Sequence, residues 1–210
     1  MKGICFKEEL FNAIIEGRKT QTRRIVKPQP PKETTWIDNV SKEGEFYWHT
    51  KESGRNYFDK NCFVPRYRVG DTVYLKEPYR DTGAPEGHFA KIDYLYDKTG
   101  LARELAGGYK WENKLFMPER YARYFIKITA VRCEHLQEIS DEDCESEGIV
   151  LTWNISRTFV IGCSNKMDGV NYNNRKEAYA ALIDKINGKG TWESNPYVFV
   201  YSFELVKKHP

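Results

Sequence analysis

The segment at residues 16–30, EGRKTQTRRIVKPQP, places cationic side chains beside hydroxyl and amide side chains within a few positions. Its cations are Arg18, Lys19, Arg23, Arg24 and Lys27, and Thr22 lies among them. Guanidinium and ammonium groups donate hydrogen bonds to phosphate oxygens, and an arginine can do so with two parallel bonds. The composition therefore fits a solvated charged turn, a phosphate-binding surface or the edge of an active site.

Other residues could complete a ligand site around this segment. The aromatic side chains that could stack on nucleobases are Trp36, Tyr47, Trp48 and Tyr79, although packing is the simpler interpretation of each one alone. Glu77 ends a predicted strand, where it could bind the exocyclic amine of a base or pair with Arg24 or Lys19. Asn195 precedes Pro196, and we expect it to cap a turn, although its side chain could also reach a cleft.

The distribution of charge says more than the net charge, which is only +3 for the 210 residues. Basic residues gather at positions 18–27, 66–68 and 120–123, whereas acidic residues gather in EISDEDCESEG. This separation allows one basic face on a nearly neutral protein, and such a face is what a nucleic-acid partner requires.

The sequence gives no reason to expect a metal site, a cofactor, a membrane helix or a signal peptide. The cysteines form no C-x-x-C pair, so we expect reduced thiols, no metal site and no cofactor. No run approaches the roughly 20 apolar residues of a membrane helix, and the N-terminus lacks the apolar core of a signal peptide. We therefore expect a cytoplasmic protein with no membrane partner, of undetermined oligomeric state.

Hydrophobic periodicity predicts the elements that must position these residues. Helices are expected in KEELFNAIIEG, SDEDCESEGI and NRKEAYAALIDKINGKG, each ending at a glycine. The apolar stripe of the third helix is formed by Tyr179, Leu182, Ile183 and Ile186. In the second helix Ser140 is the predicted N-cap, with Asp143 three residues later. Strands are expected in KGICF, VGDTVYLKE, HFAKIDYLYD, ARYFIKITAVRCEHLQEI and YVFVYSFELV.

These elements predict one α+β domain over residues 1–210. Strands with a few short helices, and no β-α-β rhythm, favour a small mixed β-barrel flanked by short helices. Two stretches without clear periodicity, at about 30–65 and 98–116, are interpreted as insertions, the first with a hairpin around EGEFYWHT.

Four sequence blocks, in order, resemble the ASCH domain family, a relative of the PUA fold. They are EGRKTQTRR after an N-terminal helix, VGDTVYLKE, a strand running into LQEISDEDCESEGI, and an aromatic final strand. The chain looks most similar to longer phage- or prophage-type members. The resemblance implies a PUA-like barrel with a cleft beside the G-x-K-T segment, and a partner that is RNA or a modified nucleoside.

The resemblance also implies roles for particular residues. In small amidohydrolases of N4-acetylcytidine within this family, the catalytic lysine, threonine and glutamate correspond to Lys19, Thr22 and Glu147 here. A lysine whose pKa is lowered by burial or neighbouring cations can deprotonate a threonine hydroxyl, and a carboxylic acid can protonate the leaving amine. Ligand contacts are expected from Arg18, Arg23, Arg24, Glu77, Tyr79 and Asn195.

The leading hypothesis from the sequence is therefore RNA or nucleoside binding in a basic cleft around GRKTQTRR. The alternatives are an amidohydrolase of N4-acetylcytidine-type nucleosides, a single-strand ribonuclease, and a phage accessory protein that binds a host protein.

Overall fold

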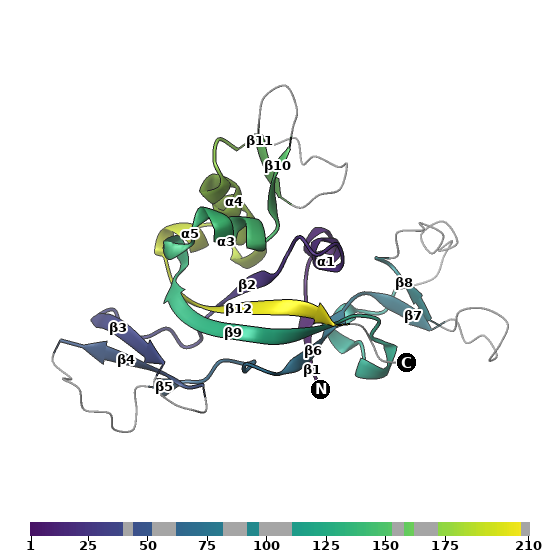
Figure 1. Ribbon diagram of the computed structural model, residues 1–210, viewed down its shortest axis with the longest axis horizontal. Helices are drawn as coiled ribbons and strands as arrows, with labels where there is room; N and C mark the ends of the chain where they lie inside the picture. Colours follow the sequence, from purple (N-terminus) through teal and green to yellow (C-terminus); the bar gives the residue numbers. More distant parts are fainter. Residues whose placement is uncertain are drawn as a thin grey trace.

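A five-stranded sheet forms the centre of the molecule (Figure 1). The structure is a computed structural model that describes residues 1–39, 44–51, 62–81, 92–96, 111–152, 158–161 and 172–206. The molecule is mostly sheet with a few helices, which confirms the predicted α+β class. None of the helices among these residues is both long and apolar enough to cross a membrane.

The strand order of the central sheet is β1-β6-β9-β12-β2. Its strands are β1 (Lys2–Cys5), β6 (Thr72–Lys76), β9 (Phe125–His135), β12 (Tyr197–Val206) and β2 (Gln21–Ile25). β1 and β6 pair in parallel, and the other neighbours pair antiparallel. β1, β6, β9 and β12 follow the predicted strands, whereas β2 lies in the charged segment, where the sequence predicted no strand.

A side chain connects the two ends of this strand order. Arg24 on β2 donates a hydrogen bond from Nη2 to the carbonyl oxygen of Cys5 on β1, with a distance of 2.9 Å. β1 and β2 are the two edge strands of this order. Closure of the sheet into a barrel therefore remains a prediction.

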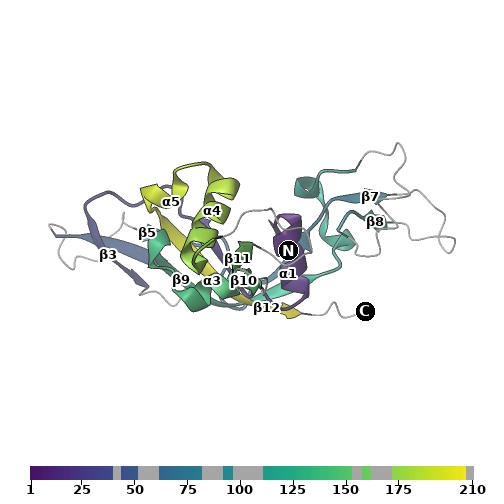
Figure 2. The ribbon, with the colours of Figure 1, turned by 90° about the horizontal axis from the view of Figure 1, so that it is seen from above.

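The helices α1 (Glu8–Ile15), α3 (Asp141–Ser146), α4 (Arg175–Asn187) and α5 (Thr191–Ser194) lie on one side of β9 and β12 (Figures 1 and 2). The predicted N-cap of α3 is confirmed, because Ser140 Oγ accepts a hydrogen bond from the Asp143 amide. α4 begins at the Asn174 cap and buries Ala178, Tyr179, Leu182 and Ile183. Short 3-10 turns lie at Lys114–Phe116, Glu119–Tyr121 and Leu136–Glu138.

Three small sheets surround this centre. They are β3-β4-β5 (Thr34–Asn39, Phe46–Thr50 and Cys62–Phe63), β7-β8 (Tyr79–Asp81 and Ile92–Tyr94) and β10-β11 (Ile149–Thr152 and Thr158–Ile161). The first two lie at opposite ends of the molecule (Figures 1 and 2). The β3-β4 pair is the hairpin predicted within the first insertion. Most of the second predicted insertion, residues 98–110, lies outside the described residues.

Candidate functional site

Lys19 and Glu147 form a buried ion pair above the central sheet. Lys19 Nζ lies 2.5 Å from Glu147 Oε2, and it also donates a hydrogen bond of 2.9 Å to the Glu147 carbonyl oxygen. The two residues are 2% and 4% exposed. Such a pair is positioned by the fold, because 128 residues separate its members along the chain.

Backbone hydrogen bonds hold both partners at the ends of helices. The Lys19 amide bonds to Ala13 O at the end of α1, at 3.0 Å. The Thr20 amide bonds to Ser146 O, the last residue of α3, at 2.9 Å. Glu147 is the C-cap of α3, and Gly148 follows with φ of +97°, a backbone conformation that favours glycine. The end of α3 is thereby bonded directly to the chain that leaves α1.

Thr22 shares a cavity with this ion pair. The cavity, hereafter the inner pocket, has a volume of about 160 Å³. Its lining includes Lys19, Thr22, Arg23, Arg24, Glu147 and Tyr179, together with apolar residues of α1 and α4. The three residues expected to be catalytic therefore surround one small pocket.

Burial changes the proton affinity of Lys19. Removal from water lowers the pKa of Lys19 from its ordinary value of 10.5, the charge of Glu147 opposes this effect, and Arg24 and Arg23 add to it. A lowered pKa increases the fraction of neutral amine near physiological pH. The pocket can therefore supply a base as well as a cation.

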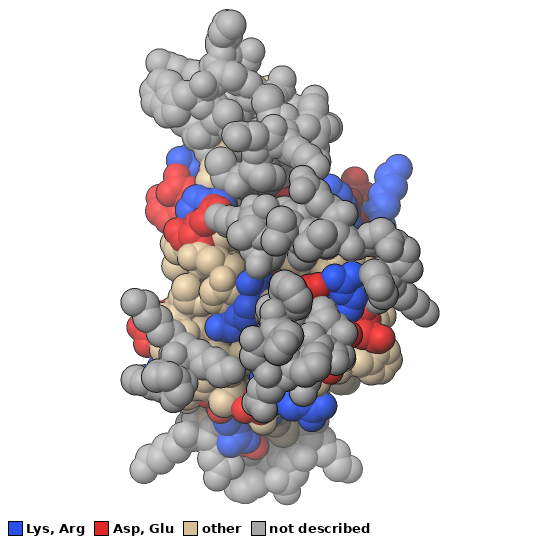
Figure 3. Space-filling model, turned by 90° about the vertical axis from the view of Figure 1, so that its right-hand side faces the viewer, with Lys and Arg blue, Asp and Glu red and all other residues tan. Residues whose placement is uncertain are grey.

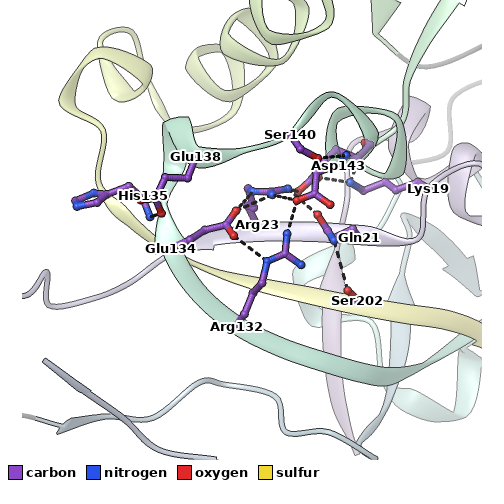
Figure 4. A network of polar contacts seen from close by, with 11 residues as sticks. Lys19, Gln21, Arg23, Arg132, Glu134, His135, Glu138, Ser140, Asp143 and Ser202 are labelled. Atoms are coloured by element: carbon purple, nitrogen blue, oxygen red, sulfur yellow. Dashed lines mark hydrogen bonds and ion pairs between the residues drawn. The ribbon is translucent and has the colours of Figure 1, made fainter. Parts of the chain in front are cut away.

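Arg23 is the centre of a network of charged groups beside the inner pocket (Figure 4). Its side chain is fully buried and forms ion pairs with Glu134 at 2.7 Å, Asp143 at 2.6 Å and Glu147 at 3.2 Å. Arg132 contacts both Glu134 and Asp143 from the other side. Since these contacts involve both guanidinium edges of Arg23, the geometry favours a role in positioning Glu147 over direct contact with a phosphate.

A second hollow, with a volume of about 590 Å³, lies on the other side of Arg24. This hollow, hereafter the basic groove, is lined by the cations Arg24, Lys27, Arg66 and Lys76 and by the rings of Tyr67, Phe199 and Tyr201. The described lining residues include no carboxylate. Arg24 and Cys5 line both hollows, so the basic groove adjoins the inner pocket.

One face of the molecule shows less separation of charge than the sequence suggested (Figure 3). On the described part of the face in Figure 3, basic and acidic side chains lie near one another instead of forming one continuous basic area. The basic groove is therefore a local concentration of positive charge.

The other predicted ligand residues lie away from both hollows. Arg18 pairs with Glu16. Glu77 is completely buried and binds Arg123 with two hydrogen bonds of 2.9 and 2.7 Å, instead of Arg24 or Lys19. Tyr79 packs on Tyr121. None of the three predicted residues lines either of the two hollows that the structure describes.

Asn195 has the turn role that the sequence favoured. It adopts a left-handed conformation with φ of 43°, and its Oδ1 accepts a hydrogen bond from the Gln137 amide at 2.8 Å. It belongs to the turn between α5 and β12 and does not line the inner pocket.

Sequence reasoning missed Asp143, Glu134, Tyr179 and Lys76 as site residues. Asp143 was noticed as part of a helix cap and Tyr179 as part of an apolar stripe, and both interpretations hold locally. Their second role comes from the packing of α3 and α4 against β2, which local sequence patterns do not encode.

No group of three or more His, Cys, Asp or Glu side chains in the described ranges is arranged to hold a metal ion. Compared with known protein families, curated proteins and solved structures, the chain matches none of them.

Proposed function

We propose that this protein binds RNA or a nucleoside, with a base in the inner pocket and, in the case of RNA, phosphate groups in the basic groove. The observation that carries this proposal is that the two hollows adjoin at Arg24 and Cys5. A nucleotide joins an anion to a planar ring with hydrogen-bonding edges, and two adjoining hollows of these kinds suit its two parts.

The proposal agrees with the resemblance to the ASCH domain and its PUA-like barrel. In that family the G-x-K-T segment lies beside the ligand cleft, and Lys19 and Thr22 line the inner pocket here. The mixed sheet of the central domain is compatible with such a barrel.

Binding of a short, fluorescently labelled single-stranded RNA tests the proposal by anisotropy. Each phosphate contact to a single strand contributes about −0.7 to the slope of log K against log salt concentration. Lys27 and Arg66 are exposed and line the basic groove. The double variant Lys27→Glu, Arg66→Glu should bind more weakly and with a shallower salt slope.

The matched control is Lys127→Glu, which changes an exposed lysine on β9 that lines neither hollow. It should bind RNA nearly as the wild type does. Absence of RNA binding by the wild type, or equal losses in the groove and control variants, would contradict the role of the basic groove.

A second candidate function is hydrolysis of an N-acylated cytidine. The observation that favours it is the buried contact between Lys19 and Glu147 in the pocket that Thr22 also lines. Transfer of a proton across this contact converts an ammonium and a carboxylate into an amine and a carboxylic acid. The lowered pKa of Lys19 eases release of its proton, and after the transfer the pair supplies one base and one acid.

The steps of this reaction balance without a further reactant except water. Lys19 accepts the Thr22 hydroxyl proton while the threonine oxygen bonds to the acyl carbon. The carbon–nitrogen bond then breaks, and Glu147 gives its proton to the leaving amine, so cytidine departs. Water hydrolyses the acyl-threonine, which releases the carboxylic acid and restores the hydroxyl.

Incubation with N4-acetylcytidine, followed by chromatography, tests this candidate. Lys19→Arg cannot supply a neutral base and should lower cytidine release by at least about 100-fold. The wild-type rate should fall at high pH, because loss of the proton that Lys19 and Glu147 share removes the acid, and the fall should begin below the ordinary lysine pKa of 10.5, since the pKa of Lys19 is lowered. Lys127→Arg is the control. Equal release from Lys19→Arg and the wild type, or no release from the wild type, would exclude this reaction and leave the binding proposal to the RNA experiment.

A further inference from the structure

The Tyr179 hydroxyl is a buried polar group without a hydrogen-bond partner among the described residues. Tyr179 is 0% exposed on α4 and lines the inner pocket. A buried hydroxyl that makes no hydrogen bond lowers stability, and such groups in folded proteins often mark a place where a ligand or water binds.

The surrounding contacts hold the ring of Tyr179 in place. The Trp192 ring packs edge-on at 6.2 Å between centroids, and the Arg23 guanidinium lies 5.9 Å from the Tyr179 centroid. The position of the hydroxyl oxygen is therefore set before any ligand binds, which reduces the entropy lost on binding.

The hydroxyl keeps its proton in this environment. Burial raises the pKa of Tyr179 well above 10.0, and the neighbouring Glu147 carboxylate raises it further, while Arg23 has the opposite effect. Tyr179 is therefore a neutral hydrogen-bond donor at physiological pH.

We propose that the Tyr179 hydroxyl donates a hydrogen bond to a carbonyl oxygen of the ligand in the inner pocket. The inference rests on the proposed function and states which group its ligand must carry. A neutral donor suits an uncharged carbonyl oxygen, as in a pyrimidine ring or an amide. An anionic oxygen at this position would be repelled by Glu147, whereas the basic groove provides cations for it.

Tyr179→Phe tests the inference because it removes the hydroxyl and keeps the ring. Calorimetry with cytidine, N4-acetylcytidine and inorganic phosphate should show about tenfold weaker binding of the two nucleosides, since one hydrogen bond to a buried carbonyl is lost. Phosphate affinity should not change. The Tm should stay constant or rise by up to about 4 °C, because an unsatisfied buried group is removed.

Tyr74→Phe is the matched control. Tyr74 is 7% exposed and lines neither hollow, and its hydroxyl donates to Met117 O at 3.2 Å. This variant loses a hydrogen bond, so its Tm should fall while nucleoside binding stays as in the wild type. Tyr179→Phe should therefore weaken nucleoside binding without lowering the Tm, whereas Tyr74→Phe should lower the Tm without weakening nucleoside binding.

The inference is overturned if Tyr179→Phe binds both nucleosides as tightly as the wild type, if phosphate affinity falls instead, or if its Tm drops as far as that of Tyr74→Phe. These outcomes leave the proposed function intact. A wild-type protein that binds neither nucleosides nor RNA would overturn the proposed function, and this inference with it.

Discussion

Arg23 pairs with three carboxylates beside the candidate site. Its buried guanidinium contacts Glu134, Asp143 and Glu147, and Gln21 Oε1 accepts a further hydrogen bond from it at 2.8 Å. A buried charge is tolerated when its hydrogen-bonding capacity is used in this way. Glu147 is consequently held between Arg23 on one oxygen and Lys19 on the other.

The same network predicts how stability depends on pH. Burial on its own would raise the pKa of Asp143, but the hydrogen bond and charge of Arg23, and the charge of Arg132, lower it below the ordinary value of 3.8. The folded protein therefore binds this proton less tightly than the unfolded chain. The stabilisation is fully present above the unfolded pKa and is lost as the pH falls through the lower, folded pKa.

Asp143→Asn should lower the free energy of unfolding at pH 7 by about 1–2 kcal/mol, because hydrogen bonds to charged groups are lost. It should also lose less stability than the wild type when the pH falls below 3.8, the ordinary value for this group. Urea unfolding at several pH values measures both effects. Asp141→Asn, an exposed acid on the same helix, is the control. Identical acid sensitivity of Asp143→Asn and the wild type would show that this ion pair contributes no pH dependence.

At the scale of the element, α3 positions two of the acids around Arg23. The helix has six residues, so its end groups form a large part of its hydrogen bonding. Ser140 Oγ accepts a hydrogen bond from the Asp143 amide. Ser140 therefore caps the start of the helix and also holds in place the residue whose carboxylate pairs with Arg23.

Ser140→Ala should lower the free energy of unfolding by about 1 kcal/mol, because the capping oxygen is lost. Nucleoside binding should weaken as well, since Asp143 and Glu147 lie on this helix and at its end. Ser140→Asn keeps an oxygen that can cap and should behave like the wild type. If the alanine and asparagine variants unfold at the same urea concentration, the cap does not stabilise α3.

The elements that the sequence predicted correctly are those with local signals. The cap and glycine of α3, the apolar stripe of α4 and the alternation in β9 and β12 all lie within short windows. β2 has no such signal, because its polar and charged residues resemble a turn. It is a strand because Gln21–Ile25 pairs with Ser202–Val198 of β12, a partner about as far away in the chain as the sequence allows.

Only part of the candidate site could be predicted from the sequence. Lys19, Thr22 and Glu147 were suggested by a family resemblance, and the structure brings them to one pocket. The roles of Arg23 and Tyr179 depend on which helix covers β2. Hydrophobic periodicity placed Tyr179 on the buried face of α4 but could not show that Tyr179 lines the pocket.

At the scale of the whole molecule, an aromatic cluster attaches the β3-β4-β5 sheet to the central sheet. Phe46 on β4 and Phe63 on β5 each lie 5.4 Å from Phe199 on β12, measured between ring centroids. Phe199 also lines the basic groove. The small sheet thus supports one wall of that groove.

Phe46→Ala should lower the free energy of unfolding by about 3 kcal/mol, since Phe46 is 3% exposed and its removal leaves a cavity. Trp36→Ala is the control on the same small sheet, because Trp36 is 40% exposed. We expect a loss below about 1 kcal/mol for this control. Chemical denaturation measures both. Comparable losses in the two variants would mean that the cluster does not join the sheets.

The long separation between Lys19 and Glu147 has a consequence for the order of events during synthesis. A nascent chain displays its basic segment early, because the acids of α3 come more than a hundred residues later. The sheet partner of β2 comes later still, because residues 198–202 of β12 complete that pairing. Until α3 has been made, Lys19 lacks Glu147, and Arg23 lacks Asp143 and Glu147. The inner pocket therefore forms only after α4, which carries several of its lining residues, has been made.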